Sequence, residues 1–143
     1  MSLDTGGALD LLAAQLRPVE NRAWPKHGYA RSVKRGLGRC SPLSEHADGW
    51  SLVGALHRLF GVPGLQSNFG TDIVLRLYCE LPARSLLPYD VQPTDWVTMA
   101  AAIEGYWFSS AEAEREKGGE PGKAALKLIT NARATYQAEL EYG

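Results

Sequence analysis

The fold of this chain is decided by the stretch Trp50-Ser51-Leu52-Val53-Gly54-Ala55-Leu56-His57-Arg58-Leu59-Phe60. One face of this stretch is formed by Trp50, Val53, Leu56, His57 and Phe60. A spacing of three or four residues is typical of an α-helix, whereas a strand alternates at every second residue. Asp48 or Ser44 is the predicted N-cap, and Gly61 followed by Val62-Pro63 is expected to end the helix.

Gly54 lies in the middle of this predicted helix, where glycine costs about 1 kcal/mol relative to alanine. A helix accepts that cost where another part of the chain comes too close to its backbone for a side chain. We therefore expect a neighbouring segment to pack directly against Gly54.

Working outward, four further segments have the same spacing and predict a mainly α fold, a compact bundle of four to five helices. The first covers residues 7–17 and ends at Pro18, because proline has no N–H to continue the helix. The helix after the central one opens at Asn68 or Thr71 and closes at Pro82. Packing of the apolar stripes should provide most of the stability of these helices.

The last two helices follow residues 83–93, a segment punctuated by prolines that predicts a loop. One begins after a Thr94 cap, and its apolar stripe consists of Trp96, Met99, Ala100, Ile103 and Trp107. The polar residues 112–117 are either a solvated extension of this helix or a mobile link. The other begins near Pro121, and its apolar seam consists of Ala125, Leu128, Ile129, Ala132, Tyr136 and Leu140.

Residues 27–41 lack the helical period, and three glycines divide them. Residues 29–33 and 39–41 are predicted to form the strands of a small β-hairpin, with a turn at 34–38 between them. The alternative is an irregular insertion. Because an isolated two-stranded hairpin is only marginally stable in water, we expect this segment to lean on the helices.

The chain has 143 residues, 45% hydrophobic and 22% charged, which predicts a single helical domain over 1–143. No apolar run approaches the roughly 20 residues that cross a bilayer, and the N-terminus lacks the pattern of a signal peptide. Cys40 and Cys79 provide neither a disulfide framework nor a CxxC pair. We therefore expect a cytoplasmic protein without membrane contact.

Charge is distributed unevenly, although the net charge is only −1. From residue 17 to residue 39, Glu20 is the one acid among seven basic residues. The candidate nucleic-acid-binding or anion-binding residues of this segment are Lys26, Arg31, Lys34, Arg35 and Arg39, since Lys and Arg neutralise phosphates. Neither a Walker pattern nor a GxGxxG turn is present. The alternative is a solvated hairpin whose cations keep its edge from pairing with other chains.

Aromatic residues suggest a second kind of contact. Trp24 and Tyr29 lie in the same basic segment and are candidate partner-binding residues, one of them as an exposed anchor, because aromatics dominate interfaces. Trp50, Trp96 and Trp107 lie on helical stripes and are expected in the core.

No metal, cofactor or catalytic residue is predicted. His27, His46 and His57 lie in three separate segments and have no metal-ligand spacing. Cys40 and His46 could be drawn as a nucleophile and its base, but no third group or oxyanion hole follows at a recognisable spacing. A thiol such as Cys40 is more often a small buried apolar group.

Residues 24–60 resemble a small bacterial and phage family of unknown function. The resemblance is carried by Trp24, Gly28-Tyr29-Ala30-Arg31, a turn at 36–38, Ser41-Pro42 and Trp50-Ser51-Leu52-Val53-Gly54-Ala55-Leu56. That family usually has cysteine at the position of Ser51, and its C-terminal half differs from this one. The resemblance implies a bacterial or phage origin and a cytoplasmic location, and it assigns no activity and no site residue.

Three functional hypotheses follow. The first is a non-enzymatic module that binds another protein or a second copy of itself, because no polar groups converge in the sequence while aromatics are plentiful. The second is nucleic-acid or phosphate binding through the basic residues 26–39. The third is an enzyme with an unrecognised site, which requires a deep pocket that contains strongly perturbed titratable groups.

Overall fold

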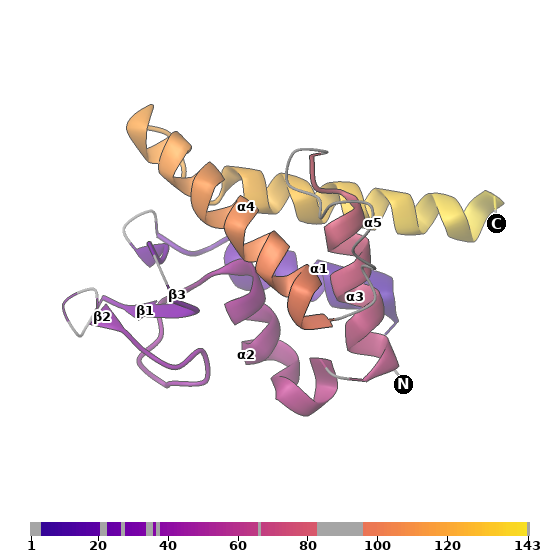
Figure 1. The fold of residues 1–143 in the computed structure, drawn as a ribbon, viewed down its shortest axis with the longest axis horizontal. Coiled ribbons are helices and arrows are strands. Elements are labelled where there is room, and N and C mark those ends of the chain that lie inside the picture. Colours follow the sequence, from indigo (N-terminus) through magenta and orange to yellow (C-terminus); the bar gives the residue numbers. More distant parts are fainter. Residues whose placement is uncertain are drawn as a thin grey trace.

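The computed structural model describes residues 4–20, 23–26, 28–33, 36, 38–65, 67–82 and 96–142. The fold is mainly α, with five helices and a small three-stranded antiparallel sheet in these ranges (Figure 1). The elements are α1 (Thr5–Leu16), β1 (Ala30–Ser32), β2 (Gly38–Arg39), β3 (Gly49–Trp50), α2 (Leu52–Leu65), α3 (Asn68–Cys79), α4 (Trp96–Glu116) and α5 (Lys123–Tyr142). The predicted fold class is confirmed.

The predicted first helix is confirmed as α1, which begins two residues earlier than expected. The side chain of Asp4 caps it, because the Gly7 backbone N–H donates to the Asp4 Oδ1 atom at 2.7 Å. Leu9, Leu12 and Leu16 are fully buried along one face. These leucines pack α1 into the common core, mainly against α5 and α2.

The start of α2 differs from the prediction, since neither Asp48 nor Ser44 caps it. Ser51 is the cap: its Oγ atom accepts a hydrogen bond from the Gly54 N–H at 3.0 Å. The carboxylate of Asp48 is instead engaged by the Val33 N–H at 2.7 Å, because Asp48 lies beside the sheet. Trp50, predicted to lie on the helix, belongs to β3.

The predicted close approach at Gly54 is confirmed. A Cβ atom at this position would overlap the backbone carbonyl oxygen of Tyr29. The same oxygen accepts a hydrogen bond from the Ser51 N–H at 3.0 Å. The segment that leads into β1 therefore rests directly on the first turn of α2. Further along, Gly61 adopts a positive φ of 71° and breaks the helical geometry inside α2.

The predicted hairpin is confirmed in β1 and β2, where Arg31 pairs with Arg39 and Ser32 with Gly38. A third strand, β3, was not predicted and pairs with the other edge of β1, which gives the order β2-β1-β3. Ala30 and Ser32 are fully buried, so the sheet leans on the helices as expected. In Figure 1 the sheet and the C-terminal end of α5 lie at opposite ends of the molecule.

In the C-terminal half, α4 continues through the polar residues to Glu116, so the prediction of a solvated helix extension is correct and that of a mobile link is wrong. The turn after it is closed by Gly118, with a φ of 75°, and by the Gly119 N–H, which donates to the Glu114 carbonyl at 2.8 Å. The predicted loop at 83–93 and the Thr94 cap lie outside the described residues.

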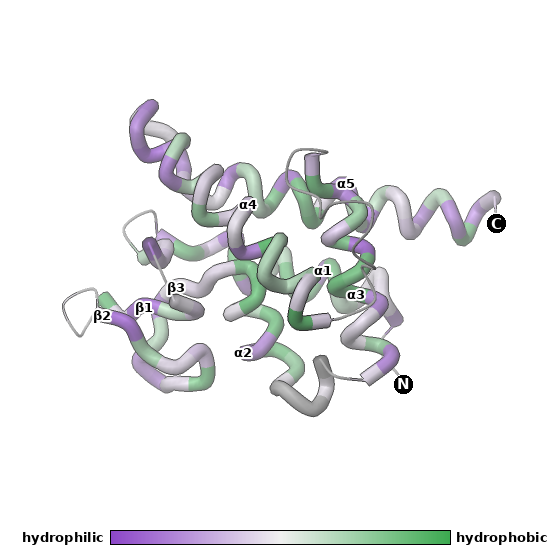
Figure 2. The backbone as a smooth tube through the Cα atoms, in the orientation of Figure 1, coloured by the Kyte–Doolittle hydropathy of each residue, from purple (hydrophilic) through white to green (hydrophobic). Residues whose placement is uncertain are grey.

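The predicted seam of α5 is correct at its N-terminal end and wrong at its C-terminal end. Leu128 and Ile129 are buried, whereas Leu140 is 60% exposed because the last turns of α5 extend beyond the bundle (Figure 1). Figure 2 shows apolar residues gathered where the helices meet and hydrophilic ones at the far end of α4. Within the described ranges, no helix is both long and apolar enough to cross a membrane.

Candidate functional site

The predicted basic residues are placed by the small sheet. Arg31 occupies the centre of β1, and Arg39 lies directly opposite it on β2, an edge strand. Lys26 is exposed in the segment before the sheet. Lys34 and Arg35, predicted at the tip of the hairpin, lie outside the described residues.

An arginine that sequence reasoning missed joins this group from α4. The Nη2 atom of Arg115 donates to the Trp24 carbonyl oxygen at 2.9 Å and to the Pro25 carbonyl oxygen at 3.4 Å. The Nη1 atom of Arg31 donates to the same Trp24 oxygen at 3.4 Å. Burial and the charge of Arg31 lower the pKa of the Arg115 guanidinium, and Glu112 raises it. We call Lys26, Arg31, Arg39 and Arg115 the cation group.

Acidic residues border the cation group on the side of α4. A hollow of about 460 Å³ is lined by Lys26, Phe108, Glu112, Arg115 and Glu116. Glu112 and Glu116 therefore face Lys26 across this hollow, while Arg39 lies on the outer edge of the sheet. Glu112 and Glu116 of α4 thus border one side of the basic segment, and Arg39 on β2 is exposed.

The two candidate anchor residues have opposite surroundings. Trp24 is only 2% exposed, and its ring packs against that of Trp107 with centroids 5.7 Å apart, so of the two candidates only Tyr29 can be the exposed anchor. The local sequence contains no helical stripe that would have indicated this burial. Tyr29 is 45% exposed, and its ring stacks on the His57 imidazole with centroids 5.3 Å apart.

His57 lies between Tyr29 and the edge of the Trp96 ring, 5.9 Å from it. Burial lowers the pKa of His57, which favours the neutral imidazole. The His57 Nε2 atom and the Trp96 Nε1 atom are buried, and neither has a hydrogen-bond partner in the part of the chain that the structure describes. This small cluster packs between α2 and α4.

Glu104 is the carboxyl group with the most strongly shifted pKa among the described residues. Its Oε1 atom accepts a hydrogen bond from the Val53 N–H at 2.9 Å, and the Ser51 side chain also hydrogen-bonds to it. Burial raises the pKa of Glu104 to about 7, against 4.5 for a free side chain, even though both hydrogen bonds favour the ionised form. A residue of α4 thus caps the N-terminus of α2, which sequence spacing does not reveal.

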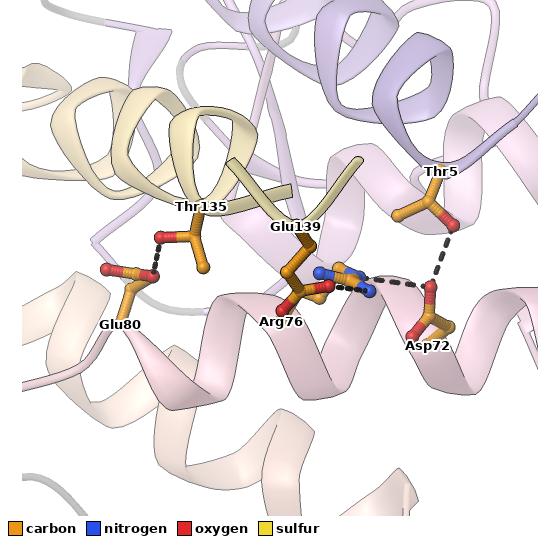
Figure 3. Close-up of polar contacts among 6 residues, drawn as sticks. All are labelled: Thr5, Asp72, Arg76, Glu80, Thr135 and Glu139. Carbon is orange, nitrogen blue, oxygen red and sulfur yellow. Dashed lines mark hydrogen bonds and ion pairs between the residues drawn. The ribbon is translucent and has the colours of Figure 1, made fainter. Parts of the chain in front are cut away.

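A polar network holds three helices together at the other end of the molecule (Figure 3). The Arg76 Nε atom lies 3.1 Å from Asp72 Oδ2, and Arg76 Nη2 lies 2.8 Å from Glu139 Oε2. Asp72 also accepts from the Thr5 hydroxyl at 2.8 Å, so the network joins α1, α3 and α5. Beside it, burial and Glu80 raise the pKa of the Cys79 thiol, which disfavours a reactive thiolate.

The solvent-facing side of α4 differs from an ordinary exposed helix face. From Trp96 to Ala111 the only charged residue is Glu104, and that side chain points inward to α2. The outward positions are Val97, Ala101, Gly105, Ser109 and Ala113, which are all exposed. We call these five residues the α4 face. A groove of about 670 Å³ runs beside it, lined by Ala102, Gly105, Tyr106, Ser109, Ser110, Ala113, Glu114, Lys117 and Ala124.

Comparisons with known proteins do not assign this chain to a family. No family model matches the sequence, and searches among curated proteins and solved structures found no match either. The resemblance of residues 24–60 to a bacterial and phage family therefore stays a prediction.

Proposed function

We propose that this chain is a non-enzymatic interaction module that associates with a second copy of itself through the α4 face. The observation that carries the proposal is the lack of any exposed charge along the first four turns of α4. A helix on the surface of a monomer ordinarily has polar or charged residues on the side that faces water. A helix without them is ordinarily covered on that side as well.

Gly105 adds a second argument. It stands in the interior of α4, where glycine costs about 1 kcal/mol relative to alanine. No neighbouring atom of the described residues lies within 4 Å of the place that a Cβ would take there. In contrast to Gly54, no contact among the described residues accounts for this glycine, and a second helix that crosses α4 at Gly105 supplies a reason for it.

The spacing of the α4 face suits two copies related by a twofold axis. When two antiparallel α4 helices cross at Gly105, residues equally far from Gly105 in opposite directions along the two helices face each other. Val97 of one copy then lies opposite Ala113 of the other. In the same way, Ala101 lies opposite Ser109. The contact is self-complementary, as a twofold interface requires, and small side chains allow the two backbones to approach closely.

The enzyme hypothesis finds less support. Glu114 and Lys117 line the groove beside α4, and neither Glu104 nor His57 is among its lining residues. Glu104 and His57, whose pKa values burial shifts, are engaged in packing α2 against α4. Neither Cys40 nor Cys79 forms a disulfide, which supports a cytoplasmic location for the module, and the resemblance of residues 24–60 supports a bacterial or phage origin.

Multi-angle light scattering over a range of concentrations tests the proposal. We expect the mass of a dimer for the unaltered chain and the mass of a monomer for Ala101→Glu, because the substitution places two carboxylates in an uncharged contact. Ala134→Glu is the matched control, since it makes the same change at an exposed position of α5, and it should leave the dimer intact. A monomeric mass for the unaltered chain at every concentration would exclude self-association.

A further inference from the structure

Glu104 lies immediately before Gly105, on the flank of α4 that faces the start of α2. Its Oε1 atom accepts a hydrogen bond from the Val53 N–H at 2.9 Å, and the Ser51 side chain also hydrogen-bonds to it. Glu104 is only partly buried, and its neighbours Ala101 and Gly105 on the α4 face are exposed. An acidic residue that joins α4 to α2 therefore keeps some contact with water at the border of the α4 face.

The proposed pair of antiparallel α4 helices brings the two copies of Glu104 to the same side of the contact. The twofold axis lies in the plane of the contact and passes beside Gly105. A rotation about this axis reverses the direction of the helix and leaves each flank beside the same flank of the second copy. Both Glu104 residues thus lie along one edge of the contact, one residue from its centre, and a helix packed over Gly105 covers their remaining exposed surface.

This cover is unfavourable for an ionised Glu104. Removing water from a carboxylate costs free energy unless a cation accompanies it. The α4 helix of the second copy brings no cation along the contact, because Glu104 is the only charged residue from 96 to 111. It brings a second carboxylate, and like charges oppose the ionisation of each other. A protonated Glu104 avoids both costs, and its carbonyl oxygen can still accept from the Val53 N–H.

Other titratable groups do not compensate the charge of Glu104. The first titratable side chain of α2 is His57, one turn after Val53, and Tyr29 lies just before β1. On α3, Tyr78 is buried in the common core, and α5 approaches the other flank of α4, where Ala124 lines the groove. Burial and the two hydrogen bonds account for the shifted pKa of Glu104, and no charge of the described residues is among its causes.

We infer that the dimer takes up one proton from solvent at Glu104 of each copy as it forms, so that self-association is stronger in mildly acidic than in mildly alkaline solution. This regulation rests on the proposed function, because it acts on the same α4 face. Burial raises the pKa of Glu104 in the single chain to about 7, and the pKa in the dimer is higher still. Association is therefore at full strength below about pH 7 and declines above it.

Sedimentation velocity between about pH 6 and about pH 8, at constant ionic strength, tests this linkage. We expect the Kd of the dimer to rise by roughly tenfold over this range, because each linked proton contributes up to tenfold per pH unit. Glu104→Gln keeps an oxygen acceptor and does not titrate, so its Kd should be the same throughout. Glu141→Gln, the same change at an exposed position of α5, is the control and should keep the full pH dependence.

A second measurement needs no substitution. Isothermal titration calorimetry of the dilution of the unaltered chain, at about pH 7.5 in two buffers of different ionisation enthalpy, counts the protons that dissociation releases. We expect a release of more than zero and at most about two protons per dimer. Dissociation without proton release would contradict the linkage.

The possible outcomes separate this linkage from the proposed function. A dimer whose Kd does not change with pH, or falls as the pH rises, leaves self-association standing and overturns the linkage. A pH dependence that persists in Glu104→Gln overturns it as well, and assigns the proton to another group such as His57. A monomeric mass at every pH and concentration overturns the proposed function itself.

Discussion

At one end of this molecule Arg76 lies between two carboxylates, and at the other Arg31 lies opposite a second arginine. The first arrangement joins α3 to α5 and is complete within the chain (Figure 3). The second gathers positive charge on a small sheet. This sheet is attached to the start of α2, where the Ser51 N–H donates to the Tyr29 carbonyl oxygen. Charges of opposite sign join helices in the first group, whereas the second places like charges on two paired strands.

The attachment of the sheet is the most sensitive point. We expect Gly54→Ala to reduce the free energy of unfolding by about 3 kcal/mol, because the new Cβ overlaps the Tyr29 carbonyl oxygen and forces the backbone apart. Urea denaturation monitored by circular dichroism measures this loss. The same substitution at Gly105, where no atom of the described residues lies within 4 Å of the Cβ position, should stabilise the monomeric Ala101→Glu background by up to about 1 kcal/mol. Equal losses at the two glycines would contradict this account.

Glu104 differs from both groups of arginines. Its carboxyl group faces the N-terminus of α2 and has no ion-pair partner among the described residues. Its pKa of about 7 in the folded chain lies above the value of 4.5 for a free side chain, so the folded state holds the proton more tightly. Stability should therefore be highest below about pH 4.5 with respect to this group. It should fall by about 2–3 kcal/mol as the pH rises toward 7, and change no further above it.

Chemical denaturation of Glu104→Gln at several pH values measures this effect. The amide keeps an oxygen acceptor for the Val53 N–H and does not titrate, so the variant should lack the decline between about pH 4.5 and 7. A decline of the same size in both proteins would assign it to other groups.

Removing one cation from each charged region compares them directly. Arg76→Met should reduce the free energy of unfolding by about 1–2 kcal/mol. The substitution removes the ion pair that joins α3 to α5 and leaves Asp72 and Glu139 without their shared cation. Arg39→Met should change stability by only a few tenths of a kcal/mol, and in the stabilising direction, since it relieves the like-charge pair with Arg31. Thermal unfolding of the two variants measures both changes in stability. A larger loss of stability in Arg39→Met than in Arg76→Met would contradict the prediction.

Much of the fold follows from local patterns. The stripe Met99, Ile103 and Trp107 correctly predicts the buried side of α4. The lack of a helical period and the three glycines at residues 27–41 correctly predict a hairpin. Trp50 shows the limit of this approach, because its spacing to Val53 fits a helix equally well, and only its pairing with Ala30 across the sheet places it in β3.

The candidate sites depend much more on tertiary structure. Arg31 and Arg39 could be predicted as basic residues of one segment, but Arg115 lies 91 residues after Trp24, whose carbonyl oxygen it contacts. Trp24 lies in an irregular segment without periodicity, so its burial against Trp107 has no local signal. The near absence of charged residues along α4 is visible in the sequence. Which residues of α4 face solvent depends on how the helices pack.

The positions of the helices and the residues of their apolar stripes follow from the order of residues alone, because residues three or four positions apart are neighbours in any helix, wherever that helix lies. Only the tertiary structure decided which polar group meets which. It brought Glu104 to the first turn of α2, Thr5 to Asp72, and Arg115 to Arg31. The physical reason is that hydrogen bonds and Coulomb forces act at distances of a few ångströms in space, and separation along the chain does not reveal such distances.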